Sequence, residues 1–337
     1  MMLCRTTTTG RGGPPLWSGK RSSVYEHGKG WRLVRQRGGE TKSPKQSLPT
    51  PLVRGGLVEE DAVADFECAA WAIPHPQKQE KGGEDSHFTF ARRRKNVDLL
   101  TMGVADGVSG WADDGVDPAL YARELSKHGR DAAWLWDDPF SIMDYAHAHS
   151  EALGSSTFTV ATIDSGSKTN ASTLRWSNVG DSGVKVFRYG SVVAASPVQE
   201  HYFNCPRQLA NPKKVKECDT PAVADGADFA LQKGDVVVLA TDGVFDNMFD
   251  RDIGVLASKR GRTAREIAEK IAKKASQNAR NPKYLSPFAK EAYALETKDT
   301  PVGLVNTFFS SMGVDTDKDN PYIGGKLDDI TVVVAKI

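Results

Sequence analysis

The chain has 337 residues, of which 39% are hydrophobic and 26% are charged, as is ordinary for a globular protein of one large domain or two small ones. No apolar run approaches the roughly 20 residues that a membrane-spanning helix needs, so a membrane span is not expected. The four cysteines form no CxxC pair, which argues against a zinc knuckle.

Charge is distributed unevenly, although the formal net charge is only +1. Residues 1–50 hold ten Lys and Arg against two acids, Glu26 and Glu40, and the remainder holds 34 basic and 41 acidic residues. A basic leader rich in Arg, Ser and Thr is typical of an organelle transit peptide, and a plain basic tail is the alternative. We predict a disordered leader over residues 1–55 that directs the protein to the mitochondrial matrix, with a plastid or the cytoplasm as alternatives.

The remaining residues, 56–337, are expected to form one folded domain. Residues 117–153 have a helical pattern that Pro139 divides into two helices, and residues 263–279 predict a helix that begins with a Thr263–Glu266 capping box. Strands are expected at 66–73, 99–105, 156–164, 172–180, 182–196 (a hairpin that turns at Tyr189-Gly190), 235–241 and 328–337. Because strands are linked locally and helices come in blocks, the pattern favours an α+β fold with largely antiparallel sheets.

Acidic residues recur where the predicted strands begin or end. They are Glu84, Asp85, Asp106, Asp181, Asp242, Asp246, Asp328 and Asp329, many of them next to glycine. A single Asp before Gly is normally a turn residue. Six such places indicate that several strand ends meet, and carboxylates gathered in this way repel one another unless a cation holds them.

The donor atoms of this acidic set are oxygens, without a His or Cys partner in the pattern. Oxygen ligands are typical of Mg²⁺ or Mn²⁺ and unlike zinc or copper sites. Two such ions roughly 3.5–4 Å apart can activate water and neutralise a phosphoryl group. The sequence therefore predicts a metal-assisted hydrolase that acts on phosphate.

Six sequence blocks resemble, in the same order, those of the metal-dependent protein phosphatases of type 2C. The blocks are GGED (82–85), ADGVSGW (105–111), STFTVATI (156–163), NVGDSG (178–183), ATDGVFDN (240–247) and LDDITVVV (327–334). The resemblance covers roughly residues 60–337. The stretches QEHYFNCPRQLA (199–210) and GVSGWADDGVDP (107–118) are similar to the branch that contains mitochondrial type 2C phosphatases.

The resemblance implies a four-layer αββα sandwich, in which two central, mostly antiparallel β-sheets are flanked by helices. It also implies hydrolysis of phosphoserine and phosphothreonine in proteins, by direct attack of a hydroxide that bridges two Mg²⁺ or Mn²⁺ ions. Such a reaction needs no phosphoenzyme, because phosphoryl transfer depends mainly on charge neutralisation and alignment.

By the same resemblance, Asp106 bridges the two ions, the Gly107 carbonyl binds one of them, and Asp106 and Asp242 are essential for catalysis. The remaining metal ligands are expected to be Glu84, Asp85, Asp242 and Asp328. Asp181 and Asp246, with Asp242, are expected to hold a third, weaker ion, although Asp181 could instead be a turn residue. Asp329 stands where the family more often has Asn, so it is expected to lie behind the ligands, with exchange of roles with Asp328 as the alternative.

Two positions depart from the family pattern. Many relatives have an arginine before the first acidic pair that grips the phosphate, and here Lys81 or Lys78 is expected to replace it as a point charge without the bidentate fork. Relatives also often have His directly after Asp-Gly, where this chain has Val108. If that His serves as general acid in the relatives, this protein must use another donor, a metal-bound water or a slower route.

Two other functions remain open on the sequence alone. One is a catalytically weak or dead phosphatase fold that acts as a scaffold, and the other is a hydrolase of small phosphate esters or a nuclease. The retained acids Asp106, Asp242 and Asp328 disfavour a dead enzyme, and the excess of acids after residue 50 disfavours nucleic acid as a partner. The expected partners are phosphorylated proteins, and the chain is expected to be a monomer.

Overall fold

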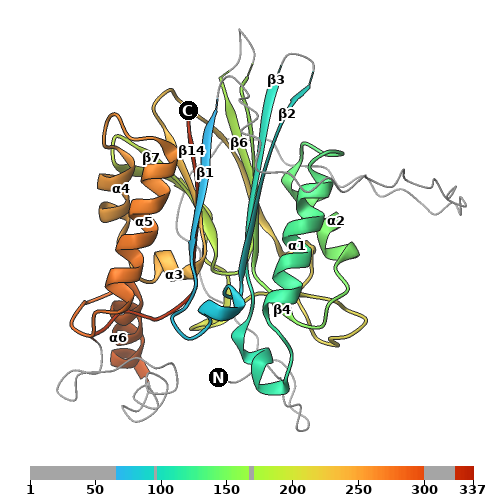
Figure 1. Ribbon diagram of the computed structural model, residues 1–337, viewed down its shortest axis with the longest axis vertical. Coiled ribbons are helices and arrows are strands. Elements are labelled where there is room, and N and C mark those ends of the chain that lie inside the picture. The colour runs from blue at the N-terminus through green and yellow to red at the C-terminus, as the bar shows by residue number, and fades with distance from the viewer. Residues whose placement is uncertain (1–65, 95–96, 167–170, 300–322) are drawn as a thin grey trace, which may run out of the picture. The chain divides into compact units, whose positions relative to one another are not determined.

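Two five-stranded sheets form the centre of the computed structural model, which describes residues 66–94, 97–166, 171–299 and 323–337 (Figure 1). The predicted leader, residues 1–55, lies outside the described residues. In spatial order, the first sheet holds β1 (Glu67–Ile73), β14 (Ile330–Lys336), β13 (Val236–Ala240), β7 (Gly183–Arg188) and β8 (Ser191–Ala195). The second sheet holds β12 (Asp225–Ala230), β6 (Thr173–Val179), β5 (Phe158–Asp164), β3 (Val97–Asp106) and β2 (Asp85–Arg94).

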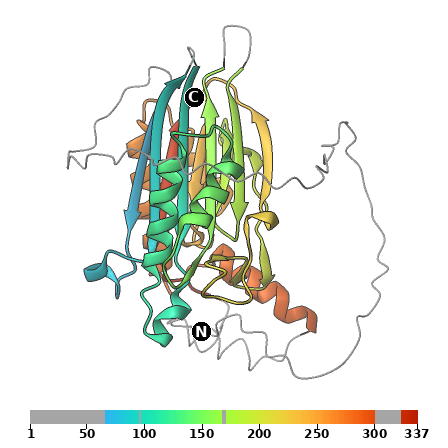
Figure 2. The same ribbon diagram turned by 90° about the vertical axis from the view of Figure 1, so that its right-hand side faces the viewer.

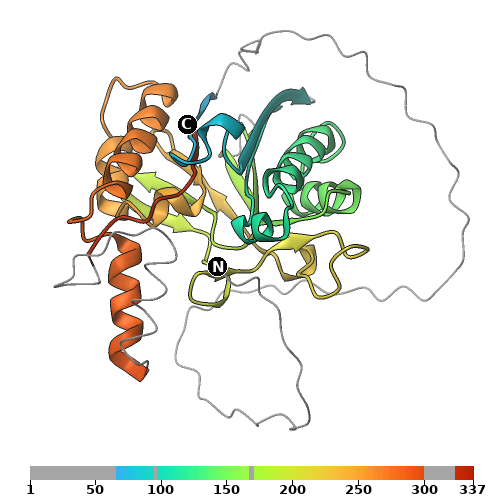
Figure 3. The ribbon, with the colours of Figure 1, turned by 60° about the horizontal axis from the view of Figure 1, so that its bottom comes forward.

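Helices cover the outer face of each sheet. Against the second sheet lie α1 (Ala119–Ala132) and α2 (Pro139–His149), whereas α4 (Asp250–Ala257) and α5 (Ala264–Ala279) cover the first (Figures 1 and 2). Figure 3 shows the four layers from the end at which α3 (Asp242–Phe245) lies, with α6 (Pro287–Asp299) beside them. All neighbouring strands within the two sheets are antiparallel, so the predicted αββα sandwich of class α+β is confirmed.

The apolar run of β13 shows why the central strands contain so few polar residues. Val236 and Val238 face α4 and α5, while Val237 and Leu239 pack against the second sheet together with Met102 of β3. A strand buried on both faces has no solvent side on which polar residues could alternate. The two sheets therefore share an apolar core, and each has a further core under its helices.

The local signals in the sequence mark the observed boundaries well. Pro139 stands at the start of α2, where Asp138 accepts the Ser141 N–H at 2.8 Å. Thr263 and Glu266 form the predicted capping box of α5. The hairpin between β7 and β8 turns at Tyr189 and Gly190, which both have positive φ.

Shorter elements complete the described part of the chain. They are η1 (Gln79–Lys81), η2 (Ser109–Asp114), η3 (Pro221–Val223), β4 (Ser155–Ser156), β9 (Glu200–Tyr202), β10 (Cys205–Pro206) and β11 (Leu209–Ala210). Strand β2 was not predicted as such, because its sequence ends in ARRR and lacks the apolar run of a central strand. It lies at the sheet edge, where charged residues are tolerated. Within the described ranges, no helix is long and apolar enough to cross a membrane.

Candidate active site

The acidic residues singled out in the sequence lie at one end of the two sheets. Strand β2 begins where β3 ends, and the register places Asp85 opposite Asp106. In the other sheet, β13 ends at Ala240 just before Asp242, and β14 begins at Ile330 just after Asp328 and Asp329. Since the strands are antiparallel, starts and ends of alternate strands meet at the same edge, which is the lower end in Figure 1.

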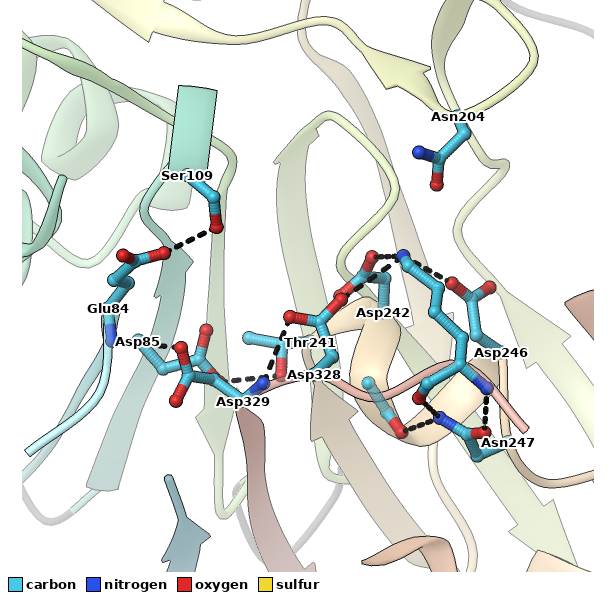
Figure 4. A network of polar contacts seen from close by, with 12 residues as sticks. Glu84, Asp85, Ser109, Asn204, Thr241, Asp242, Asp246, Asn247, Asp328 and Asp329 are labelled. Carbon is cyan, nitrogen blue, oxygen red and sulfur yellow. Dashed lines mark hydrogen bonds and ion pairs between the residues drawn. The ribbon is translucent and has the colours of Figure 1, made fainter. Parts of the chain in front are cut away.

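Thr241 joins the two edges. Its hydroxyl donates a hydrogen bond to Asp85 Oδ2 at 2.9 Å, so a residue at the end of β13 in one sheet contacts the start of β2 in the other (Figure 4). Asp106 is in turn an electrostatic neighbour of both Asp242 and Asp85. The acids Asp85, Asp106 and Asp242 are therefore neighbours, although they are far apart in the chain.

Mutual repulsion in a site that excludes water governs the protonation of these acids. Burial, together with the Asp242 and Asp85 carboxylates, raises the pKa of Asp106 well above its usual range. Burial and Asp329 do the same for the pKa of Asp85. Burial and the neighbouring Asp242 raise the pKa of Asp328 to about 6. When ionised, these acids therefore carry more negative charge than their protein surroundings stabilise.

The site contains carboxylate oxygens that suit a metal ion. Three buried oxygens, Asp85 Oδ1, Asp181 Oδ1 and Asp242 Oδ1, have no hydrogen-bond partner. Unpaired buried oxygens are costly unless a cation or water meets them, and an oxygen donor set suits Mg²⁺ or Mn²⁺. Among the described residues, no three His, Cys, Asp or Glu side chains are yet gathered tightly enough to ligate one ion. The donor set thus fits a hard cation, which would draw these side chains together.

A buried lysine, Lys326, lies among the acids on the β13 side of the site. Its ammonium forms ion pairs with Asp242, with Asp246 at 2.7 Å and with Asp328 at 3.2 Å. Burial alone would raise the pKa of Asp242, but Lys326 and further hydrogen bonds outweigh it and lower that pKa. Burial raises the pKa of Asp246 to about 7 although Lys326 opposes it. Lys326 therefore favours the ionised form of Asp242.

The first acidic pair is split between two environments. Asp85 faces Asp106 and Thr241, whereas the Glu84 carboxylate is paired with Lys78 Nζ at 2.5 Å and accepts the Ser109 hydroxyl (Figure 4). Lys78 was expected to contact phosphate, and its ammonium contacts Glu84, Ser109 and, at 3.6 Å, Asp329.

Asp329 lies behind the other acids and fixes the loop that carries the first pair. Its Oδ1 accepts the His75 N–H at 2.7 Å and its Oδ2 accepts the Glu84 N–H at 3.0 Å. Both carboxylate oxygens are thus used by backbone donors.

Glycines after two of the aspartates allow close backbone contacts. A Cβ on Gly243 would lie 2.0 Å from the Asp329 carbonyl oxygen, and one on Gly107 would lie 2.5 Å from that of Pro118. The Gly107 N–H also donates to the Glu84 carbonyl at 3.3 Å. Neither position has room for a side chain.

The Asp181 side chain belongs to the same acidic set. It follows Gly180 in the turn between β6 and β7, and burial and Asp242 raise its pKa well above the usual range. Its electrostatic neighbours are Asp242, Lys326 and Asp246. Asp181 therefore lies both in a turn and within electrostatic reach of the other acids.

Comparison with known proteins gives consistent relatives, although no protein-family model matches the chain. The chain is 38% identical over 269 residues to "Probable protein phosphatase 2C 26" of Arabidopsis thaliana, which covers 79% of this chain and 82% of the relative. It is 34% identical over 273 residues to the "Protein phosphatase PTC7 homolog" of Homo sapiens, with 75% of this chain and 79% of the relative covered. The chain belongs to the protein phosphatase 2C family.

A solved structure supports the same assignment. The chain resembles the "X-ray structure of the photosystem II phosphatase PBCP" with a TM-score of 0.67 and 33% identity, over 81% of this chain and 98% of that one. The predicted type 2C family and its PTC7-like branch are confirmed. The protein is thus a metal-dependent phosphatase of phosphoserine and phosphothreonine, a hydrolase.

Two basic residues of this phosphatase site were missed by the sequence patterns. One is Lys326, which stands two residues before Asp328 and contacts acids 80 and 84 residues earlier in the chain. The other is Arg123 of α1, whose guanidinium donates to the carbonyls of Lys81 and Gly83 at 3.0 and 3.2 Å. The run GGKLDD could have drawn attention to Lys326, but Arg123 carries no motif signal.

Proposed function

We propose that this phosphatase holds two Mg²⁺ or Mn²⁺ ions between the ends of its sheets and hydrolyses phosphoprotein substrates there. The observation that carries the proposal is the meeting of Asp85, Asp106 and Asp242 from both sheets, with buried Asp85 and Asp242 oxygens left unpaired. Divalent ions would neutralise charge that the protein alone leaves uncompensated.

The residues divide into ligands and supports. We assign Asp106 to both ions, Asp85, Glu84 and the Gly107 carbonyl to one side of the site, and Asp242 and Asp328 to the other. Asp329 supports the ligands by holding the loop of the first acidic pair through the N–H groups of His75 and Glu84. When bound, the ions supply an activated water nucleophile at neutral pH and neutralise the phosphoryl oxygens.

Lys81 and Lys78 are the proposed contacts of the substrate phosphate. Lys81 is exposed at the end of η1, and Arg123 holds the carbonyl of the same residue, so the loop is fixed while the Lys81 side chain extends to solvent. Lys78 is already paired with Glu84, and it would reach a phosphate only as part of that pair. Lys81 is therefore the first choice.

The proposal is tested by the metal dependence of hydrolysis in single-site variants. We expect the purified chain to hydrolyse p-nitrophenyl phosphate and phosphothreonine peptides with Mn²⁺ or Mg²⁺ and to lose this activity in EDTA. Asp106→Asn and Asp242→Asn should each lower kcat/KM by at least about a thousandfold, since each removes ligand charge at the reacting centre, which is worth several kcal/mol.

The control is Asp228→Asn, on the exposed edge strand β12, whose turnover should match that of the wild type. Circular dichroism must show all three variants folded. Near-normal turnover in Asp106→Asn would contradict the site, and a folded wild type without any metal-dependent hydrolysis would favour the scaffold function instead.

The place of action is also a proposal. We infer import into the mitochondrial matrix from the basic leader of residues 1–55, in line with the PTC7 homologs among the relatives. The relative titled photosystem II phosphatase makes a plastid the second candidate. Import of the labelled full chain into isolated mitochondria and chloroplasts, with shortening by cleavage, distinguishes the two. An intact chain excluded from both organelles would contradict the leader assignment.

A further inference from the structure

Lys326 is an unusually enclosed lysine. It is only 6% exposed, and its ammonium is within ion-pair distance of Asp242, Asp246 and Asp328. Buried lysines are rare unless paired, because an ammonium without counter-charges is expensive to remove from water. The contacts are therefore specific, and their geometry places a fixed positive charge between α3 and the start of β14.

The fold holds the backbone of Lys326 in place independently of the acids. The fully buried Asn247 accepts the Lys326 N–H at 2.9 Å and donates to the Lys326 carbonyl at 2.8 Å. Asn278 of α5 fixes the backbone of Asn247 by donating to its carbonyl at 2.8 Å. The Phe288 ring lies 5.3 Å from the ammonium. Figure 4 shows Asn247 beside the acids Asp242 and Asp246.

The ammonium lies among the acids that were expected to hold a third ion. Those acids are Asp181, Asp242 and Asp246, and Lys326 pairs with two of them and is an electrostatic neighbour of the third. A divalent ion bound by the same oxygens would lie within a few ångströms of the ammonium. Like charges at that distance in a site with little water repel strongly.

We propose that the Lys326 ammonium permanently occupies the third cation position, so that this phosphatase binds two divalent ions and not three. The inference rests on the proposed two-ion function. It assigns Lys326 as a positioning residue whose ammonium holds Asp242 Oδ2 and occupies the space beside Asp246. Asp242 Oδ1 has no hydrogen-bond partner and stays available to the two ions, and Asp328 Oδ2, at 3.2 Å, is the more distant contact of the ammonium. Asp85 and Asp106 lie outside its ion pairs and remain open to metal.

The test counts Mn²⁺ ions on the full chain, by electron paramagnetic resonance of free Mn²⁺ and by isothermal titration calorimetry. We expect two ions on the wild type and three on Lys326→Met, which keeps an unbranched side chain but removes the charge. Lys326→Arg keeps the charge and should remain at two. The matched control is Lys78→Met, which removes one positive charge from the same acidic site while leaving Lys326 in place, and it should also bind two.

Three ions on the wild type, or two on a folded Lys326→Met, would overturn the assignment of Lys326. If Lys326→Met does not fold, anomalous scattering from Mn²⁺ in wild-type crystals decides the question. A peak between Asp181, Asp242 and Asp246 overturns the inference, and an ammonium there with two peaks elsewhere supports it. Fewer than two ions on the wild type would instead overturn the proposed two-ion function, so the two failures are distinguishable.

Discussion

At the scale of single residues, the two oxygens of Asp329 show how one carboxylate can organise a site without binding the substrate. They accept N–H groups of His75 and Glu84, which lie more than 240 residues earlier in the chain. The Asp329 side chain is 4% exposed, so these bonds are shielded from water. An Asn in this position would present one oxygen and one NH₂ group, so one of the two N–H donors would face another donor, and the aspartate suits this loop.

Replacement of Asp329 should therefore be costly for folding. We expect Asp329→Ala to lower the free energy of unfolding by about 2–4 kcal/mol, because two buried N–H groups lose a charged acceptor. The matched control is Asp228→Ala, whose carboxylate is 70% exposed and lies 3.7 Å from Arg175, and it should cost less than about 1 kcal/mol. Urea unfolding in EDTA measures both. Equal losses of unfolding free energy in Asp329→Ala and Asp228→Ala would contradict the role of Asp329 in holding the loop.

At the scale of elements, a buried hydrogen bond joins α1 to α2. The Tyr121 hydroxyl and His147 Nδ1 are 3.0 Å apart, and both side chains lie in the core between these helices and the second sheet. Burial lowers the pKa of His147, although Asp144 opposes it. Neutral His147 is therefore the form that fits between the two helices.

This pair predicts a pH dependence of stability. Since the pKa of His147 is lower in the folded chain than the usual value of about 6.5, the unfolded chain binds more protons between the two values. The stabilisation is complete above about pH 6.5 and is lost as the pH falls. We expect the shift of Tm between pH 7 and pH 5 in EDTA to be less favourable in the wild type than in His147→Gln, because the raised pKa values of Asp246 and Asp328 act in the opposite direction in both proteins. An equal shift of Tm with pH in the wild type and in His147→Gln would contradict the assignment of this pH dependence to His147.

At the scale of the whole molecule, the two sheets share one apolar core, and their antiparallel strands bring the acids to one end. Each strand that ends in an acid is anchored by its neighbours, as β13 is between β14 and β7. The residues of the three hydrophobic cores come from both sheets and from the helices that cover them.

Deletion of the leader tests this domain boundary. We expect a chain of residues 56–337 to keep the Tm and the Mn²⁺-dependent turnover of the full chain, because the sheets and their helices lie in the retained part. Thermal unfolding and hydrolysis of p-nitrophenyl phosphate are the measurements. A fall in Tm of more than about 4 °C, equivalent to about 2 kcal/mol for a domain of this size, would show that the domain extends into the leader.

Short-range sequence patterns predicted much of the fold. The apolar run VVVLA predicted a strand buried on both faces, and Pro139 predicted the start of a helix. The Thr263–Glu266 pair predicted the capping box at the start of another helix. The expected ends of these strands also agree with the structure, because apolar runs that stop at Asp-Gly mark them clearly. The edge strand β2 escaped prediction because packing, and not its own sequence pattern, determines its state.

The sequence by itself determined the ingredients of the site, namely acids at strand ends with oxygen as the donor atom. Only the tertiary structure decided how these acids differ. Asp85 faces Asp106, Glu84 turns to Lys78, Asp329 holds a loop, and Lys326 enters the space between Asp242 and Asp246. The reason is that each role depends on contacts between residues tens to hundreds of positions apart, and such contacts exist only once the two sheets have packed.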